Sequence, residues 1–312
     1  MNRLNIIFMG TPDFALPCLK ALGQSGHRVS LVVTQPDRPK GRGRKLAEPP
    51  VKQTAKELGY TVVQPDSVAT EDFYRHVSEL RPDVFVVAAF GHILPKRLLE
   101  LPPMGAINLH ASLLPKYRGP SPIQWAIING ETETGVTSML MDAGLDTGEI
   151  LISRSTPVYA DDTAGTLHDR LALMAADVLL LTLEGFSSGT IRPVPQNHAM
   201  ASYAPMLKKS DGHLDWTRTA EYLERFIRGM TPWPGAYAYW NNKKLNIYRA
   251  EIRPGDREYQ PGTVINAFDN ELRVAAGKDA LSILEIQAES GRRMNIEEFL
   301  KGVSLPPGTV LK

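Results

Sequence analysis

Short apolar runs alternate with helically spaced apolar positions along the first 186 residues. The run at 4–9 ends at Gly10, positions 12–22 have helical spacing, and a second apolar run follows at 29–33. Short apolar runs bounded by turn residues indicate buried strands, and a strand–helix–strand order indicates parallel pairing. Further strands are expected at 62–63, 84–89, 107–110, 135–142 and 150–158, and helices at 50–59, 69–80, 122–128 and 163–183. The sequence therefore predicts an α/β fold with a doubly wound, mostly parallel sheet.

The pattern changes after Gly185. Small and turn residues dominate up to 206, so we interpret 187–206 as a linker. A helix is expected at 219–228, followed by short strands at 236–240, 244–249, 262–266, 271–275 and 280–286. Closely spaced short strands with turn signals predict a small β-barrel of OB-like type. The expected organisation is a domain at 1–186, a linker at 187–206 and a smaller C-terminal barrel domain at 207–312.

Composition narrows the class of protein. The 312 residues carry a net charge of +1, so any surface for a polyanion must be a local patch. Cys18 is the single cysteine, which excludes an internal disulfide, and we interpret it as a buried apolar filler. We expect a cytoplasmic protein without membrane association, because no signal peptide or bilayer-length apolar stretch is found. Nothing in the sequence resembles an interface stripe, which favours a monomer.

Two common kinds of site are not expected. The turn after the first strand reads MGTPDF and lacks the G-x-G-x-x-G pattern of dinucleotide-binding folds. The seven histidines are scattered, and neither C-x-x-C nor H-E-x-x-H occurs, so no metal site is expected.

The candidate chemistry lies on the strand near 107–110 and in a later loop. Asn108 and His110 are two residues apart, so both side chains point to the same face of that strand. A neighbouring amide and imidazole can stabilise an oxygen that gains negative charge. Asp146, in a glycine-flanked loop, can keep His110 protonated or accept a proton. Taken singly, Asn108 also fits a turn former, His110 a structural histidine, and Asp146 the first residue of an Asx-turn.

A basic segment follows the second strand. Residues 35–46 contain Arg38, Lys40, Arg42, Arg44 and Lys45, and prolines and glycines are expected to keep the segment out of regular structure. From spacing alone it fits equally a solvated surface loop and a contact for RNA phosphates.

Several motifs resemble those of the methionyl-tRNA formyltransferases, a family that uses 10-formyltetrahydrofolate. The resemblance covers nearly the whole chain. It is carried by Asn108-Leu109-His110, Ser112-Leu113-Leu114-Pro115, Tyr117-Arg118-Gly119, Met141-Asp142, Gly144-Leu145-Asp146-Thr147-Gly148, Gly10-Thr11-Pro12-Asp13-Phe14-Ala15, Thr34-Gln35-Pro36-Asp37-Arg38-Pro39, Gly41-Arg42-Gly43-Arg44 and Pro232-Trp233-Pro234.

The resemblance implies a Rossmann-like formyltransferase fold and assigns roles to these residues. The catalytic set would be Asn108, His110 and Asp146. The residues that would contact folate are Phe90, Gly91, Ile93, Ser112, Leu113, Leu114 and Pro115. The residues of the basic segment that would contact the acceptor arm of the tRNA are Arg38, Lys40, Arg42, Arg44 and Lys45. For 90–93, ordinary packing is the alternative.

The implied reaction moves a formyl group from 10-formyltetrahydrofolate, a cosubstrate rather than a tightly bound cofactor, to the methionine amine of initiator methionyl-tRNA. The C-terminal barrel would then bind tRNA. One rival is a formyltransferase with a small amine acceptor, such as glycinamide ribonucleotide or an amino sugar nucleotide. Another is a non-catalytic RNA-binding protein on a decayed enzyme fold.

Overall fold

The computed structural model describes residues 3–40, 45–255, 258–268 and 270–312 and divides the chain into two compact units. The first unit comprises Met1–Pro122, Glu133–Pro157 and His168–Ala204. The second comprises Ile123–Thr132, Val158–Leu167 and Pro205–Lys312. Two short stretches of the N-terminal half therefore pack with the C-terminal unit, which the apolar pattern did not indicate. The boundaries at 186 and 206 remain a prediction.

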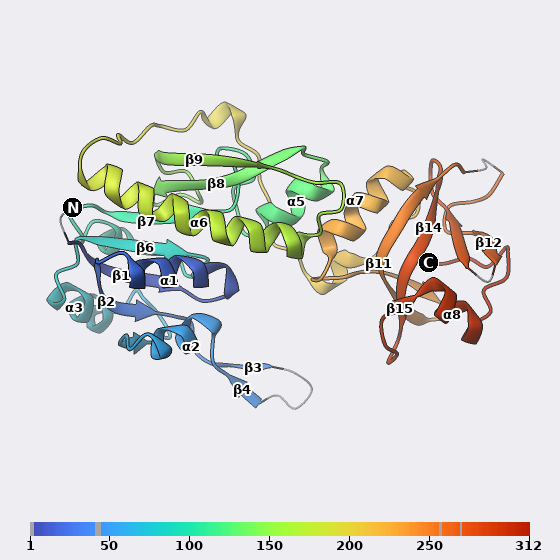
Figure 1. The fold of residues 1–312 in the computed structure, drawn as a ribbon, viewed down its shortest axis with the longest axis horizontal. Coiled ribbons are helices and arrows are strands. Elements are labelled where there is room, and N and C mark those ends of the chain that lie inside the picture. Colours follow the sequence, from blue (N-terminus) through green and yellow to red (C-terminus); the bar gives the residue numbers. More distant parts are fainter. Residues whose placement is uncertain (1–2, 41–44, 256–257, 269) are drawn as a thin grey trace. The chain divides into compact units, whose positions relative to one another are not determined.

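A mixed sheet forms the first unit, with strand order β5-β2-β1-β6-β7-β8-β9 among the described residues (Figure 1). Neighbouring strands are parallel from β5 to β7, whereas β8 and β9 run antiparallel at one edge. The predicted α/β fold with a mostly parallel sheet is confirmed. The strands are β1 Asn5–Gly10, β2 Arg28–Val33, β5 Val62–Val63, β6 Val84–Ala88, β7 Ala106–His110, β8 Glu133–Leu140 and β9 Ile150–Pro157.

Helices cover both faces of this sheet. The helical elements of the first half are η1 Asp13–Ala15, α1 Leu16–Gln24, α2 Pro50–Glu57, α3 Glu71–Glu79, α4 Lys96–Leu99, α5 Pro122–Ile128 and α6 Ala164–Ser187. Thr70 accepts a hydrogen bond from the Phe73 amide, which explains why α3 begins at Glu71 rather than at the expected 69. Cys18 is fully buried in α1, as expected, and burial raises the pKa of its thiol to about 12.

Alternation along the strands decides which face the candidate site occupies. Ile7, Met9 and Val87 belong to one buried cluster with Ala106 and with residues of α3 and α4. Because side chains two apart share a face, the residues of β7 at positions 108 and 110 lie on the face that carries Ala106. Figure 1 shows α1 and α6 in front of the sheet.

The expectation that 35–46 lacks regular structure is wrong at both ends. β3 (Arg38–Lys40) pairs antiparallel with β4 (Lys45–Ala47), and Pro39 lies opposite Leu46. A two-stranded ladder leaves one side of each strand unpaired, so a proline without an N–H group is tolerated there. Residues 41–44 lie outside the described part of the chain.

The second unit contains an antiparallel sheet of order β10-β11-β14-β13-β12, with β15 paired to β14. Its elements are the short helical turn η3 Lys209–Gly212, α7 Ala220–Met230, β10 Ala236–Trp240, β11 Lys243–Arg253, β12 Val264–Phe268, β13 Glu271–Ala275, β14 Ala280–Ala288, β15 Met294–Asn295 and α8 Ile296–Gly302. Another short helical turn, η2 His198–Met200, belongs to the first unit. Sequence analysis missed α8, which begins where the Asn295 side chain accepts from the Glu298 amide.

The last four residues close the C-terminal sheet into a barrel. The Leu311 amide donates to Gly262 and the Val264 amide to Thr309, which joins the tail to the β12 side of the sheet. On the opposite side, the backbone groups of Lys312 and Tyr239 bond to each other in both directions. Closure removes the free edges of the sheet, which accounts for the predicted barrel.

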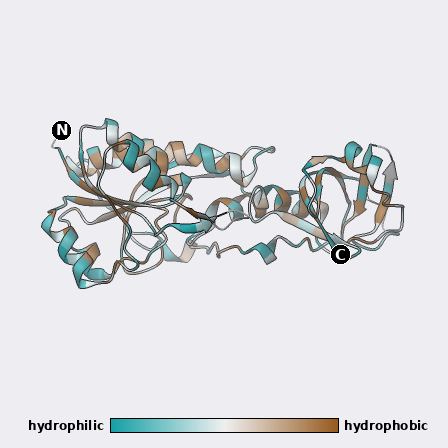
Figure 2. Ribbon diagram, turned by 90° about the horizontal axis from the view of Figure 1, so that it is seen from below, coloured by the Kyte–Doolittle hydropathy of each residue, from teal (hydrophilic) through white to brown (hydrophobic). Residues whose placement is uncertain are grey.

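Hydropathy follows this architecture. In Figure 2 brown residues gather along the strands of the first unit, whereas its helices and the strands of the second unit carry both brown and teal residues. Among the described residues, no helix combines the length and the apolar character that a bilayer crossing requires.

We predict that Leu311 stabilises the barrel mainly by burial. Leu311 is 2% exposed, whereas its neighbour Val310 is 51% exposed. Leu311→Ala is expected to lower the free energy of unfolding by about 2–4 kcal/mol, and Val310→Ala by less than about 0.5 kcal/mol. Urea unfolding followed by tryptophan fluorescence measures this in the second unit, which holds all four tryptophans. Equal losses in both variants would contradict the closure role of the tail.

Candidate active site

β7 places Asn108 and His110 on one face of the sheet. In the ladder, Asn108 lies between Val87 and Met139, and His110 lies opposite Thr137. His110 is 6% exposed. Asn108 is half-buried, and no hydrogen bond to its side chain is found among the described residues. The side-chain amide therefore remains available to a substrate.

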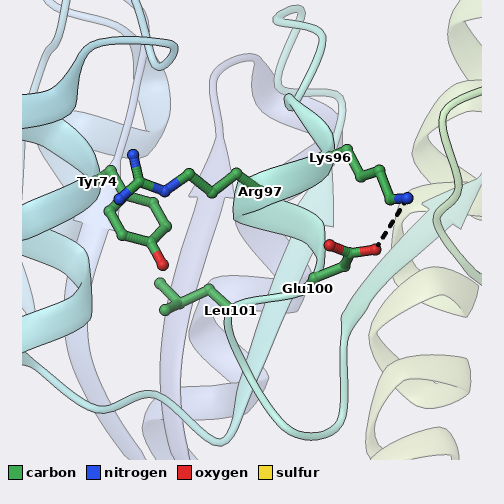
Figure 3. A pocket seen from close by; sticks show the side chains of 5 residues that line it. All are labelled: Tyr74, Lys96, Arg97, Glu100 and Leu101. Carbon is green, nitrogen blue, oxygen red and sulfur yellow. Dashed lines mark ion pairs between the residues drawn. The ribbon is translucent and has the colours of Figure 1, made fainter.

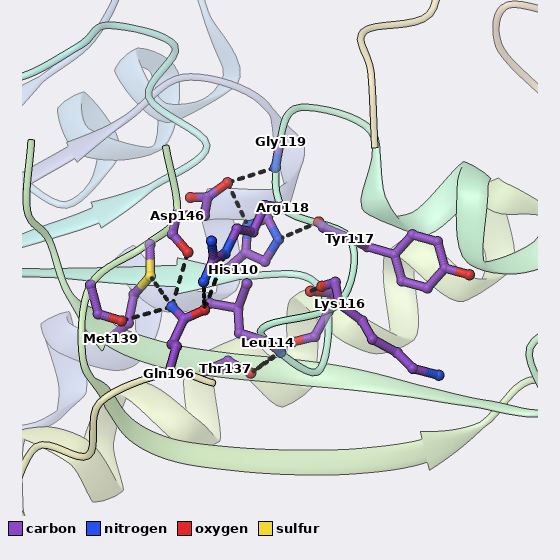
Figure 4. Close-up of polar contacts among 12 residues, drawn as sticks. His110, Leu114, Lys116, Tyr117, Arg118, Gly119, Thr137, Met139, Asp146 and Gln196 are labelled. Carbon is purple, nitrogen blue, oxygen red and sulfur yellow. Dashed lines mark hydrogen bonds and ion pairs between the residues drawn. The ribbon is translucent and has the colours of Figure 1, made fainter. Parts of the chain in front are cut away.

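The turn that follows β7 fixes the imidazole. The Ser112 hydroxyl donates to the Lys116 carbonyl at 2.6 Å, and the Leu114 amide donates to the Thr137 hydroxyl at 3.2 Å. This folding brings the Tyr117 carbonyl to 2.9 Å from His110 Nε2 (Figure 4). Because a carbonyl can only accept, Nε2 carries a hydrogen and donates it. The other ring nitrogen, Nδ1, is left to face Asp146.

Asp146 comes from the loop between β8 and β9. That loop leaves β8 at Leu140, which pairs with Ile107, and then folds back toward His110. Oδ2 of Asp146 accepts from the Gly119 amide at 2.8 Å and lies 3.6 Å from His110 Nδ1 (Figure 4). The structure thus brings a carboxylate and an imidazole from distant parts of the sequence into direct proximity.

The ends of the loop are tightly constrained. Asp142 Oδ1 accepts from the Gly144 amide at 2.9 Å and from the Thr147 hydroxyl at 2.6 Å. A Cβ on Gly148 would lie 1.6 Å from the Leu140 carbonyl oxygen, so only glycine permits this approach of the two strand ends.

Sequence reasoning missed residues that the segment 187–206 contributes. Gln196 is 6% exposed and donates to the carbonyls of Asp146 and Gly148 at 2.9 and 2.7 Å. The Ser202 hydroxyl accepts from the Tyr117 amide at 2.9 Å. These residues occur in a stretch whose composition is that of a linker, and no sequence signal marks their backbone partners.

The predicted folate residues occupy varied positions. Phe90 is buried in the cluster that shares its sheet face with His110, whereas Ile93 is 90% exposed. Gly91 has φ +81°. The side-chain Nε2 of Gln35 donates to the carbonyls of both Phe90 and Gly91. In the second segment, Ser112 and Leu114 are buried and Leu113 and Pro115 half-buried. Their contacts with folate remain a prediction.

The predicted tRNA residues are described only in part. Arg38 is exposed and donates to Gln35 Oε1 at 2.6 Å. The backbones of Lys40 and Lys45 lie opposite each other in the ladder of β3 and β4. Arg42 and Arg44 lie outside the described residues. The base of this hairpin is held by an ion pair of Asp37 with Lys52 at 2.8 Å. Hydrogen bonds from Lys52 and Gln64 lower the pKa of Asp37.

Surface hollows lie in the described part of the first unit. One, of about 610 Å³, is lined by Tyr74, Lys96, Arg97, Glu100 and Leu101 (Figure 3) and contains no predicted site residue. Its cations are paired, Lys96 with Glu100 at 3.5 Å and Arg97 with Glu71, and Arg97 also covers the Tyr74 ring at 3.6 Å. Another hollow, of about 400 Å³, adjoins the Asp146 loop at Asp142, Thr147 and Gln196.

No group of three or more possible metal ligands gathers in the described ranges.

Comparison with protein families matches both halves of the chain. Residues 2–183 match the family described as formyl transferase, and residues 206–304 match the formyl transferase C-terminal domain. Among solved structures, the N-formyltransferase from Helicobacter canadensis, in complex with folinic acid and dTDP-3-aminofucose, has a TM-score of 0.67 at 19% identity. The alignment covers 90% of this chain and 99% of that one, which shows a shared fold.

Two curated relatives match over nearly their whole length. The methionyl-tRNA formyltransferase of Desulfotalea psychrophila is 51% identical over 100% of this chain and 96% of its own. That of Caldanaerobacter subterraneus subsp. tengcongensis is 50% identical over 99% of this chain and 100% of its own. The chain belongs to the methionyl-tRNA formyltransferase family.

Proposed function

We propose that the protein transfers the formyl group of 10-formyltetrahydrofolate to the α-amino group of methionine on initiator methionyl-tRNA, which gives N-formylmethionyl-tRNA for translation initiation. The observation that carries the proposal is the approach of the Asp146 carboxylate to His110, on the strand face that also carries the Asn108 amide, for which the described residues offer no hydrogen-bond partner. Folate is a cosubstrate that leaves after each turnover.

The reaction is acyl transfer between two nitrogens. The methionine amine attacks the formyl carbon, the carbonyl π bond opens, and the oxygen becomes an oxyanion. The Asn108 side-chain amide and an N–H group at His110 Nδ1 stabilise that charge by hydrogen bonding, since Nε2 already donates to the Tyr117 carbonyl. When the carbonyl re-forms, the bond from carbon to the folate N10 breaks, and N10 takes up a proton from water or from His110 as it leaves. An amine needs no covalent enzyme intermediate.

Asp146 accepts the proton that the attacking amine loses. Its Oδ2 is occupied by the Gly119 amide, whereas no hydrogen bond to Oδ1 is found in the described part of the chain. Oδ1 is therefore the atom that we assign to proton transfer, directly or through one water. Asn108, His110 and Asp146 are the proposed catalytic residues, and Phe90, Gly91, Ile93 and Ser112–Pro115 the proposed folate contacts.

The whole-length similarity to the two curated relatives, whose names state a tRNA substrate, supports methionyl-tRNA as the acceptor. The paired β3 and β4 strands place Arg38, Lys40 and Lys45 on one antiparallel ladder in the first unit, and a concentration of basic residues suits contact with an RNA backbone. We place the activity in the cytoplasm, with the monomer as the working form.

Two alternative functions compete with the proposed one. The Helicobacter canadensis structure is of an N-formyltransferase with an amino sugar nucleotide, and a small amine acceptor would use the same catalytic groups. A non-catalytic RNA-binding protein would bind tRNA without folate. The proximity of His110 and Asp146 favours catalysis over the second rival.

An acceptor assay tests the proposal directly. With formyl-labelled 10-formyltetrahydrofolate, we expect rapid labelling of initiator methionyl-tRNA and none of glycinamide ribonucleotide or an amino sugar nucleotide. Labelling of a small amine at equal or greater kcat/KM would overturn the assignment of the acceptor. Binding of tRNA without any formyl transfer would overturn the enzyme assignment.

We predict that His110→Ala and Asn108→Ala each lower kcat by about 100-fold to 1,000-fold, because each removes one oxyanion donor worth about 3–4 kcal/mol. Single-turnover formylation with saturating substrates measures the loss. His76→Ala, on the exposed side of α3, serves as the control and should retain wild-type turnover. Near-wild-type turnover of His110→Ala would end its assignment as catalytic.

The basic segment gives a separate prediction. Replacing Arg42, Arg44 and Lys45 with glutamine should raise KM for methionyl-tRNA. The slope of log KM against log salt concentration should also fall, by an amount that corresponds to up to about three phosphate contacts, because fewer counterions are released. Folate affinity should not change.

A matched control removes three exposed charges elsewhere, at Lys20, Arg75 and Lys96. KM is measured from 50 to 200 mM salt, about the range in which such contacts weaken most. Equal changes in both triple variants would show that only net charge matters, against a tRNA contact by the segment.

A further inference from the structure

Gln196 takes no part in the proposed reaction, yet its side chain contacts both loops of the candidate site. Its Nε2 donates to the carbonyls of Asp146 at 2.9 Å and Gly148 at 2.7 Å. A carboxamide NH2 group has two hydrogens, and both are used here. The bonds hold the backbone on either side of Thr147, and so they determine where the Asp146 side chain begins.

The backbone at Asp146 needs such support. Its φ is +53°, a left-handed conformation that is disfavoured for residues other than glycine and persists where surrounding contacts hold it. The backbone direction at this residue sets the path of the carboxylate, whose Oδ2 lies 3.6 Å from His110 Nδ1. If the loop relaxed to a negative φ, the carboxylate would move away from the imidazole.

Arg118 determines which way the carboxamide points. Gln196 Oε1 accepts from Arg118 Nη2 at 2.6 Å and Nε at 3.2 Å (Figure 4). A guanidinium group can only donate, so the amide oxygen must face Arg118 and the NH2 group must face the Asp146 loop. The reversed amide would place donors against donors on one side and an oxygen against two carbonyls on the other.

Gln196 is itself fixed by backbone contacts on both sides. Val194 and Ile150 exchange two hydrogen bonds at 2.8 and 2.9 Å, which attaches this segment to the start of β9. Farther along, the Ser202 carbonyl accepts from the Arg118 amide at 2.9 Å. The carboxamide is therefore presented from a segment bound to the sheet and to the turn after β7.

We propose that Gln196 is a positioning residue: its carboxamide, oriented by Arg118, holds the loop conformation that places the Asp146 carboxylate against His110. It touches only the backbone of Asp146 and acts through that residue. The role rests on the formyl transfer proposed above, in which Asp146 accepts a proton.

The variant Gln196→Met tests this role, because methionine keeps the length of the side chain and removes its hydrogen bonds. We expect kcat for methionyl-tRNA formylation to fall about 10-fold to 100-fold, the effect of a catalytic group displaced by about 1 Å. KM for tRNA and for folate should stay within about threefold, because the contacts made equally in ground and transition states are kept.

Asn5→Leu is the matched control. Asn5 Nδ2 also donates to two backbone carbonyls, those of Leu80 at 2.8 Å and Arg81 at 3.0 Å, at the start of β1. Thermal unfolding of both variants reports the loss of stability, and kcat is measured well below both midpoints. The positioning role predicts a kcat loss in Gln196→Met alone. Equal kcat losses, or an unchanged kcat in Gln196→Met, would overturn it.

A second variant keeps the test decisive if Gln196→Met does not fold. Arg118→Met leaves the carboxamide in place and removes what orients it, so kcat should fall in the same direction. In the double variant the loss should not exceed that of Gln196→Met alone, because both changes break one chain of contacts. Losses that multiply would show that Arg118 acts independently and would refute its orienting role.

A spectroscopic measurement separates this role from the proposed function. The ring ¹⁵N signals of His110, recorded at fixed pH without substrate, should change in Gln196→Met and stay unchanged in Asn5→Leu. If those signals respond while the wild type formylates no methionyl-tRNA, the positioning role stands and the proposed function fails. If the wild type formylates it and Gln196→Met changes neither signals nor kcat, only the positioning role fails.

Discussion

The hydrogen bond between His110 and the Tyr117 carbonyl is the contact on which the candidate site depends. Two residues farther on, the Gly119 amide binds the Asp146 carboxylate, and Arg118 between them binds Gln196. Three consecutive residues thus set the imidazole, the carboxylate and the support of the loop. A buried imidazole or carboxylate left without a partner would cost about 1–3 kcal/mol or more, so the turn and the site stabilise each other.

Strained backbone accompanies this arrangement. Tyr117 and Asp146 both have left-handed φ, at +59° and +53°, and each such residue costs about 1–3 kcal/mol. The compensation is local: the Ser202 hydroxyl accepts from the Tyr117 amide, and Gln196 donates to the Asp146 carbonyl. The segment at 194–204 therefore acts as a brace for two strained positions, although its composition is that of a linker.

Sequence alone predicts the parts of this design that depend on periodicity or on glycine and proline. Alternation places Asn108 and His110 on one face, and the turn after β7 follows from its prolines and Gly119. Backbone partners have no residue signature, so the Tyr117 carbonyl and the role of Gln196 could not be foreseen. The β3–β4 ladder was also missed, because residue propensities treat Pro39 as a residue that ends a strand. On the unpaired side of a two-stranded ladder no backbone N–H group is needed, so proline is tolerated there.

The distribution of satisfied and open polar groups argues for a prepared site. His110 Nε2, Asp146 Oδ2 and the whole Gln196 carboxamide have protein partners. In the described residues, the Asn108 amide on β7 and Asp146 Oδ1 in the loop between β8 and β9 have none. Groups that fix geometry are thus saturated by the protein, while those facing a substrate are left to it. Because the fixed dipoles need not reorganise when charge develops, this division favours stabilisation of a transient oxyanion over tight binding of the ground state.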